Sequence, residues 1–157
     1  MFKKIILAVV IAAVAFSLYY FIPFPKTMDF KMDGFIRNAK GETITPCSVE
    51  FSGGMQRYLI KKENLLEGTL RLTAESQDLT YTFHTVVTSY RLRDLNYAYG
   101  YRYDEQNNSV SCKLYFTNNL STYVILDNGT AYCVSTLEEE KFLKIYEVIA
   151  QTNILSD

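Results

Sequence analysis

Residues 110–134 read VSCKLYFTNNLSTYVILDNGTAYCV and hold three β-rich runs separated by two polar turn sequences. The second turn is Asp127-Asn128-Gly129, and an Asn-Gly pair between apolar runs is a strong short signal for a β-hairpin. The stretch is therefore predicted to form three consecutive antiparallel strands, Val110–Thr117, Thr122–Leu126 and Thr130–Val134.

A helix is predicted directly after these strands, over residues 136–151. Ser135 and Thr136 each lie three residues before a glutamate, so either residue completes a capping box. Apolar residues then recur at the spacing of one helix face, namely Phe142, Ile145, Tyr146 and Ile149. Such an amphipathic helix is expected to pack on the β-rich part of the chain and close it.

The chain before residue 110 alternates between β-rich runs and polar turns. Thirteen Tyr and ten Phe, together with many Thr and Val, favour strands. The predicted strands are Thr27–Arg37, Thr43–Ser52, Gln56–Ile60, Leu66–Ala74, Leu79–Ser89 and Leu95–Tyr103. The predicted fold is mainly β, an antiparallel β-sandwich or a strongly curved sheet of about eight strands with one C-terminal helix.

Residues 1–25, MFKKIILAVVIAAVAFSLYYFIPFP, are predicted to form an N-terminal membrane anchor. The segment 5–22 carries no charge, and as a helix it spans about 27 Å, close to the hydrocarbon thickness of a bilayer. Two tyrosines near its far end suit the headgroup level, and Pro23 then ends the helix. We therefore expect residues 5–22 to cross the membrane.

Two other interpretations of this segment stay open. Two lysines and the small residues of Ala13-Val14-Ala15 are typical of a signal peptide, and cleavage after Ala15 would make the protein secreted. A buried core helix is the third interpretation. The apolar run continues past Ala15, which favours the anchor. The basic N-terminal flank then predicts a single-pass protein of the cell membrane, with a cytoplasmic N-terminus and an extracytoplasmic domain over residues 26–157.

The composition narrows the classes of partner. The formal net charge is −1, so no electrostatic argument supports nucleic-acid binding, and no nucleic-acid partner is expected. The roughly 130 residues after the anchor suit one domain with its own core. The expected partners are the membrane, through residues 5–22, and a protein of the cell envelope.

The three cysteines, Cys47, Cys112 and Cys133, leave at least one thiol unpaired within the chain. Cys47 and Cys112 alternate in step with apolar residues and are predicted core positions. A Cys112–Cys133 disulfide would be natural outside the cytoplasm, but an intervening strand would hold the backbones roughly 10 Å apart. Buried free thiols are therefore favoured. The spacing matches no metal-site pattern, and neither a metal nor another cofactor is expected.

The candidate binding site is a run of alternating tyrosines, with small residues and Arg102 between them: Tyr97, Tyr99, Tyr101 and Tyr103. In a strand, all four rings project from one face. One interpretation is an exposed aromatic platform for a glycan, a peptide or a partner protein, with Arg102 on the opposite face. The other is a tyrosine-rich inner face whose hydroxyl groups reach the sheet edge or water.

The sequence shows no catalytic constellation. His84, the only histidine, alternates onto the more polar side of its strand, and nothing nearby supplies an orienting carboxylate or a nucleophile. Arg91 and Arg93 could hold an anion, but a solvated connector is the simpler interpretation. No enzyme is therefore expected, although an acid pair assembled in space stays open as an alternative.

These observations predict a single-pass membrane protein that presents a β-rich interaction domain outside the cytoplasm, as a component or modulator of an envelope assembly. The alternative is a module that binds a glycan or a small ligand through the stripe Tyr97–Tyr103. A third interpretation is an enzyme whose residues meet only in the fold.

Overall fold

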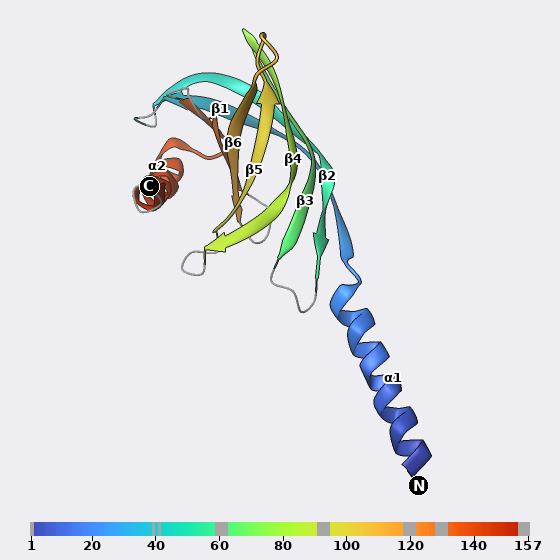
Figure 1. The fold of residues 1–157 in the computed structure, drawn as a ribbon. Helices are drawn as coiled ribbons and strands as arrows, with labels where there is room; N and C mark the ends of the chain where they lie inside the picture. Colours follow the sequence, from blue (N-terminus) through green and yellow to red (C-terminus); the bar gives the residue numbers. More distant parts are fainter. Residues whose placement is uncertain are drawn as a thin grey trace.

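The computed structural model describes residues 2–38, 40, 42–58, 63–90, 95–117, 122–127 and 132–153. Within them, eight antiparallel strands follow one another around a closed barrel, and a helix lies at each end of the chain (Figure 1). The elements are α1 (Phe2–Phe21), β1 (Phe24–Asn38), β2 (Thr43–Arg57), β3 (Asn64–Ala74), β4 (Gln77–Tyr90), β5 (Leu95–Tyr103), β6 (Ser109–Thr117), β7 (Tyr123–Asp127), β8 (Tyr132–Ser135) and α2 (Glu139–Asn153).

The predicted mainly β fold with a C-terminal helix is confirmed, and the sheet curves until it closes on itself. Each strand pairs with the next along the chain, and β8 returns to pair with β1, from Phe35 opposite Ser135 to Asn38 opposite Tyr132. A closed barrel is a finer form of the curved sheet that the sequence predicted. Closure also joins the first and last strands, which an open sheet would leave as edges.

The predicted break between the strands Thr43–Ser52 and Gln56–Ile60 is wrong; residues 59–60 of the second predicted strand lie outside the described residues. Strand β2 runs through Gly53 and Gly54 and ends at Arg57. Gly53 lies opposite Gly68 of β3, and a Cβ on Gly53 would overlap the backbone of Glu67. The glycines thus allow two strands to approach closely instead of reversing the chain.

The interior of the barrel is filled by side chains that alternate inward along each strand. The largest cluster contains Phe51, Leu70, Phe83 and Leu114, each at most 1% exposed. Between β1 and β7, Phe30 stacks on Tyr123 with ring centroids 4.1 Å apart. The barrel is therefore a packed core.

The predicted thiol positions are confirmed for two of the cysteines. Cys47 and Cys112 are buried and form no disulfide. Burial raises the pKa of the Cys47 thiol to about 11, and that of the Cys112 thiol to about 12. The side chain of Cys133 lies outside the described residues, but β7 does separate its strand from β6, as expected.

Helix α2 covers the outer wall formed by β5, β6 and β7. The predicted apolar face of the helix packs there against Leu95, Tyr115 and Val124. The predicted capping box is wrong for both candidates, because α2 begins at Glu139, whereas Ser135 is the last residue of β8 and Thr136 lies in the bend between them. The Ser135 hydroxyl oxygen instead accepts a hydrogen bond from Leu137 N, within the turn that leads from β8 to α2.

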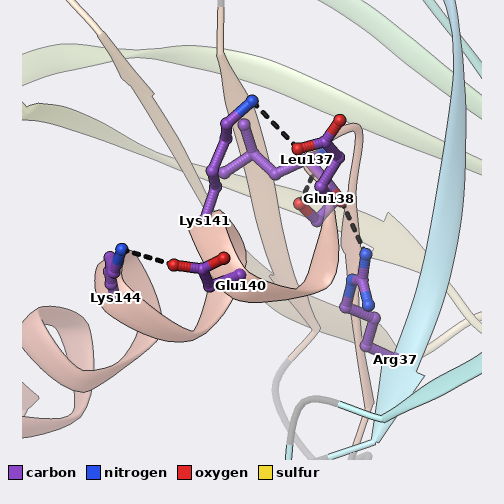
Figure 2. A network of polar contacts seen from close by, with 7 residues as sticks. Arg37, Leu137, Glu138, Glu140, Lys141 and Lys144 are labelled. Atoms are coloured by element: carbon purple, nitrogen blue, oxygen red, sulfur yellow. Dashed lines mark hydrogen bonds and ion pairs between the residues drawn. The ribbon is translucent and has the colours of Figure 1, made fainter.

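Arg37, on β1, connects the segment just before α2 to the barrel through a hydrogen bond (Figure 2). Its guanidinium, 1% exposed, donates to the carbonyl of Leu137 at 2.6 Å and to Thr43 Oγ1 at 2.7 Å. It also lies 5.2 Å from the centre of the Phe142 ring, within the range of a cation–π contact. The two ion pairs in Figure 2, Lys141 with Glu138 and Lys144 with Glu140, lie on the solvent side of α2 and add little stability.

Helix α1 extends away from the barrel and none of its residues is buried (Figure 1). In the described part of the chain it is the one helix long and apolar enough to cross a membrane. Signal sequences share this length and composition, so the uncleaved anchor and its orientation remain predictions.

Candidate functional site

The predicted tyrosine stripe lies on the outer wall of the barrel. Along β5, Asn96, Ala98 and Gly100 are buried while the alternate residues face outward. Tyr99, Tyr101 and Tyr103 are 48%, 37% and 61% exposed. We call these three residues the tyrosine face. Tyr97 does not join them, because it is half-buried and packs in the cluster beneath α2.

The rings of the stripe meet edge to face. Tyr101 and Tyr103 have centroids 5.6 Å apart and planes at 78°, and Tyr97 and Tyr99 meet at 84°. On the adjacent strand, Lys113 Nζ lies 5.1 Å from the centre of the Tyr99 ring. The tyrosine face thus combines upright rings, their hydroxyl groups and one ammonium group.

The wall beside the tyrosine face contains an irregularity in the pairing of β4 with β5. Phe83 lies opposite Gly100 and Thr88 lies opposite Tyr97, so β4 has more residues than β5 between these two pairs. Val86 lies in this bulged segment and is exposed. Bulges re-aim side chains, and this one adds an apolar group to the outer wall.

Arg102 is placed away from the tyrosine face, in the barrel interior. Its Nε forms an ion pair with Asp127 Oδ2 at 2.9 Å, and the two side chains are 14% and 3% exposed. The Tyr81 hydroxyl donates to the same oxygen at 3.2 Å, and burial, followed by the charge of Asp127, raises the pKa of Tyr81. Arg102 therefore contributes to the core and not to an outer binding surface.

Asp127 was predicted to lie in a hairpin turn, yet it is the last residue of β7 and points inward. The signal that would have found it is the alternation Tyr123, Ile125, Asp127, in which every member is buried. A carboxylate in step with two core residues indicates a buried partner of opposite charge.

His84 lies on the outer wall, as its alternation predicted. Its Nδ1 is 2.7 Å from Glu67 Oε1, and Gln56 Nε2 donates to Glu67 Oε2 at 2.9 Å. Sequence reasoning missed Glu67 because the two residues meet only through the pairing of β3 with β4. The contact supplies an orienting carboxylate, and both side chains are solvent-exposed.

Two further candidates concern anion binding and metal binding. Arg91 and Arg93 lie outside the described residues. Among the residues that the structure describes, no group of three His, Cys, Asp or Glu side chains gathers as a metal-binding set.

Comparisons with known proteins found no matching family model, no matching curated protein and no matching solved structure. The fold and its surfaces define an eight-stranded antiparallel barrel with an apolar N-terminal helix and a C-terminal helix.

Proposed function

We propose that this chain is a single-pass membrane protein whose barrel docks a partner protein of the cell envelope through the tyrosine face. The observation that carries the proposal is the exposure of three neighbouring tyrosines on one strand, Tyr99, Tyr101 and Tyr103. Tyrosine is enriched at protein interfaces and at the residues that dominate their binding energy.

The position of the tyrosine face in the barrel wall supports this role. Strand β6 pairs with β5 along the whole tyrosine face, from Tyr99 opposite Lys113 to Tyr103 opposite Ser109, and β4 pairs with β5 at Tyr101, so the backbone beneath the rings is held in place. Tyrosine offers a large amphipathic contact area and loses little side-chain entropy on binding. A partner would therefore meet a surface that is already organised.

The arrangement of the rings favours a protein over a glycan. Tyr101 and Tyr103 stand at 78° to one another, so they form separate ridges and not a continuous flat platform. Ridges fit between the side chains of a protein surface, whereas a sugar ring stacks best on a flat one. Binding of a glycan or a small ligand through the same residues is the alternative function.

The apolar helix α1 supports the membrane part of the proposal. In the proposed arrangement it spans the bilayer with its N-terminus in the cytoplasm and holds the barrel at the outer surface, as a component or modulator of an envelope assembly. Confinement to one membrane raises the effective concentration of two proteins, so an interface of modest size suffices.

Photo-crosslinking in intact membranes tests the docking surface. A photoreactive phenylalanine derivative would replace Tyr99, Tyr101 or Tyr103, with Glu50 on β2 as the matched control, because it is also exposed and lies on a different wall. We expect all three positions to give one common adduct that the control lacks. Adducts equally strong at residue 50, or none at all, would contradict the proposal.

A second experiment separates the partner classes. Here the photoreactive residue replaces Lys113, which lies beside the tyrosine face. The triple substitution Tyr99→Ser, Tyr101→Ser, Tyr103→Ser should then abolish the adduct from position 113 and leave the circular dichroism spectrum unchanged. Retention of cell-wall glycan fragments by the original chain, and its loss in the triple variant, would instead favour the glycan alternative.

The orientation of the protein in the membrane has its own test. Protease added to intact cells should digest the barrel, and digestion only after lysis would contradict an extracytoplasmic domain.

A further inference from the structure

A small polar cavity lies at the end of the barrel where β2 finishes and β3 begins. Its volume is about 80 Å³, and its lining residues are Met55, Arg57, Asn64, Val87, Ser89, Asn96 and Phe116. We call this cavity the membrane-side mouth, because it lies close to the end of the apolar helix α1. Cavities that enclose drug-sized ligands measure roughly 300–1,000 Å³, so this one suits a single compact group.

The membrane-side mouth lies close to the end of α1. Arg57 is paired with Phe24, the first residue of β1, and α1 ends at Phe21. Three residues of extended chain reach at most about 10 Å. The headgroup layer on each side of a bilayer is roughly 5–7 Å thick. If α1 spans the membrane, the mouth lies within the headgroup layer or directly beside it. Figure 1 shows this end of β2 on the side of the barrel that α1 leaves.

Arg57 supplies a positive charge to this cavity. Its Nε atom is buried and has no hydrogen-bond partner. Two other arginines of the barrel form ion pairs, Arg71 with the carboxylate of Asp78 and Arg102 with that of Asp127. A guanidinium stays protonated, and a buried donor without an acceptor costs free energy. The cavity therefore favours a ligand that brings negative charge and acceptor oxygens.

Among the described residues that line the membrane-side mouth, the polar groups other than Arg57 are neutral. The Ser89 hydroxyl donates to Asn96 Oδ1 at 2.6 Å, which orients the Asn96 amide, and Asn64 adds a second amide to the lining. Apolar side chains, among them Val87 and Phe116, complete the wall.

We propose that the membrane-side mouth binds a phosphate group through Arg57, with Asn64 as a second donor. The fork of guanidinium N–H groups matches phosphate oxygens, and the cavity admits one such group but not a whole lipid. Where α1 spans the bilayer, the source is the headgroup of a phospholipid, and this source rests on the membrane part of the proposed function. Free phosphate carries the same chemistry and is the other source.

Isothermal titration of the full chain in dodecyl maltoside, without phosphate buffer, tests the site. The probes are monomeric dihexanoyl phosphatidylglycerol, inorganic phosphate and acetate. We expect the two phosphates to bind, acetate to bind at least tenfold more weakly, and Arg57→Gln to weaken phosphate binding at least tenfold, or about 1.4 kcal/mol. Arg71→Gln, on the outer wall, should change the dissociation constant less than twofold.

Each outcome decides the proposal. Tighter binding of the lipid than of inorganic phosphate supports a headgroup site, and equal binding supports a site for free phosphate. Absence of phosphate binding, equal binding of acetate, or equal losses in Arg57→Gln and Arg71→Gln overturns it. If Arg57→Gln fails to fold, Asn64→Leu is the second variant, expected to weaken binding severalfold. The titration uses neither the tyrosine face nor a bilayer, so its result is independent of the docking experiments.

Discussion

The ion pair inside the barrel gives the most direct test of the packing described above. Replacing Arg102 by Met keeps an unbranched apolar stem in the core but removes the guanidinium that meets Asp127 at 2.9 Å. The Asp127 side chain is 3% exposed, so water does not replace the lost partner. The Tyr81 hydroxyl remains as a donor to the carboxylate.

The expected cost follows from this burial. Removing one partner of a buried ion pair destabilises a protein by about 3–5 kcal/mol, because an uncompensated charge is left behind. Domains of this size are stable by about 5–15 kcal/mol, so the loss would be a large share of the total. The double variant Arg102→Met, Asp127→Leu should lose less, about 1–3 kcal/mol, because no charge is left unpaired in the core although the Tyr81 hydroxyl loses its acceptor.

Urea unfolding of the full chain in dodecyl maltoside, followed by circular dichroism, measures these values. The matched control is Arg71→Met, since the Arg71–Asp78 pair is shorter, at 2.6 Å, but its side chains are 59% and 50% exposed. We expect no measurable change in the control, because solvent screens an exposed pair. Equal losses in the two single variants, or a double variant that loses the sum of both single changes, would refute the argument that burial decides the energy.

Two further predictions concern the barrel interior. Gly100→Ala should cost about 1–3 kcal/mol in urea unfolding, since overpacking strains a filled core. A Cβ there would lie within 2.9 Å of three Phe83 ring atoms. Phe83→Leu in the same chain should recover part of the loss, Gly54→Ala is the control with less crowded surroundings, and a neutral Gly100→Ala would contradict this packing. In a Cys133→Ser background at pH 8, Cys112, whose burial raises the thiol pKa to about 12, should be alkylated by iodoacetamide only after urea unfolding. At that pH a pKa near 12 leaves only about one thiol in ten thousand as the reactive thiolate, and rapid alkylation of the folded chain would contradict the burial.

The strands could be predicted where alternation and turn chemistry agree. The predicted runs Val110–Thr117 and Thr122–Leu126 match β6 and β7 within a residue or two, because apolar residues alternate between polar turn sequences. At Gly53 and Gly54 the sequence predicted a break between two strands, but β2 runs through both glycines. Glycines mark both turns and close strand contacts, and only the pairing with Gly68 of β3 distinguishes the two.

The orientation of β5 could not be predicted, because alternation shows that two faces differ but does not show which one is inside. Large aromatic residues usually favour the core, which would have placed the tyrosines inward. The opposite holds because the barrel interior is already filled at this level by residues such as Phe83. Only small residues such as Gly100 fit against that ring. The interior volume is filled by side chains from all the strands, so the sequence of β5 alone does not determine which of its faces points inward.

The division of the outer wall also depends on contacts far apart in the sequence. Helix α2 covers Tyr97 but leaves Tyr99 and the rest of the tyrosine face exposed, although all four tyrosines share one alternating pattern. The position of α2 is set in part by Arg37, which bonds to Leu137 one hundred residues later in the chain. The boundary between the core and the candidate binding surface is thus set by the position of α2 on the barrel. The alternating pattern of β5 carries no information about contacts, such as that of Arg37 with Leu137, that fix this position.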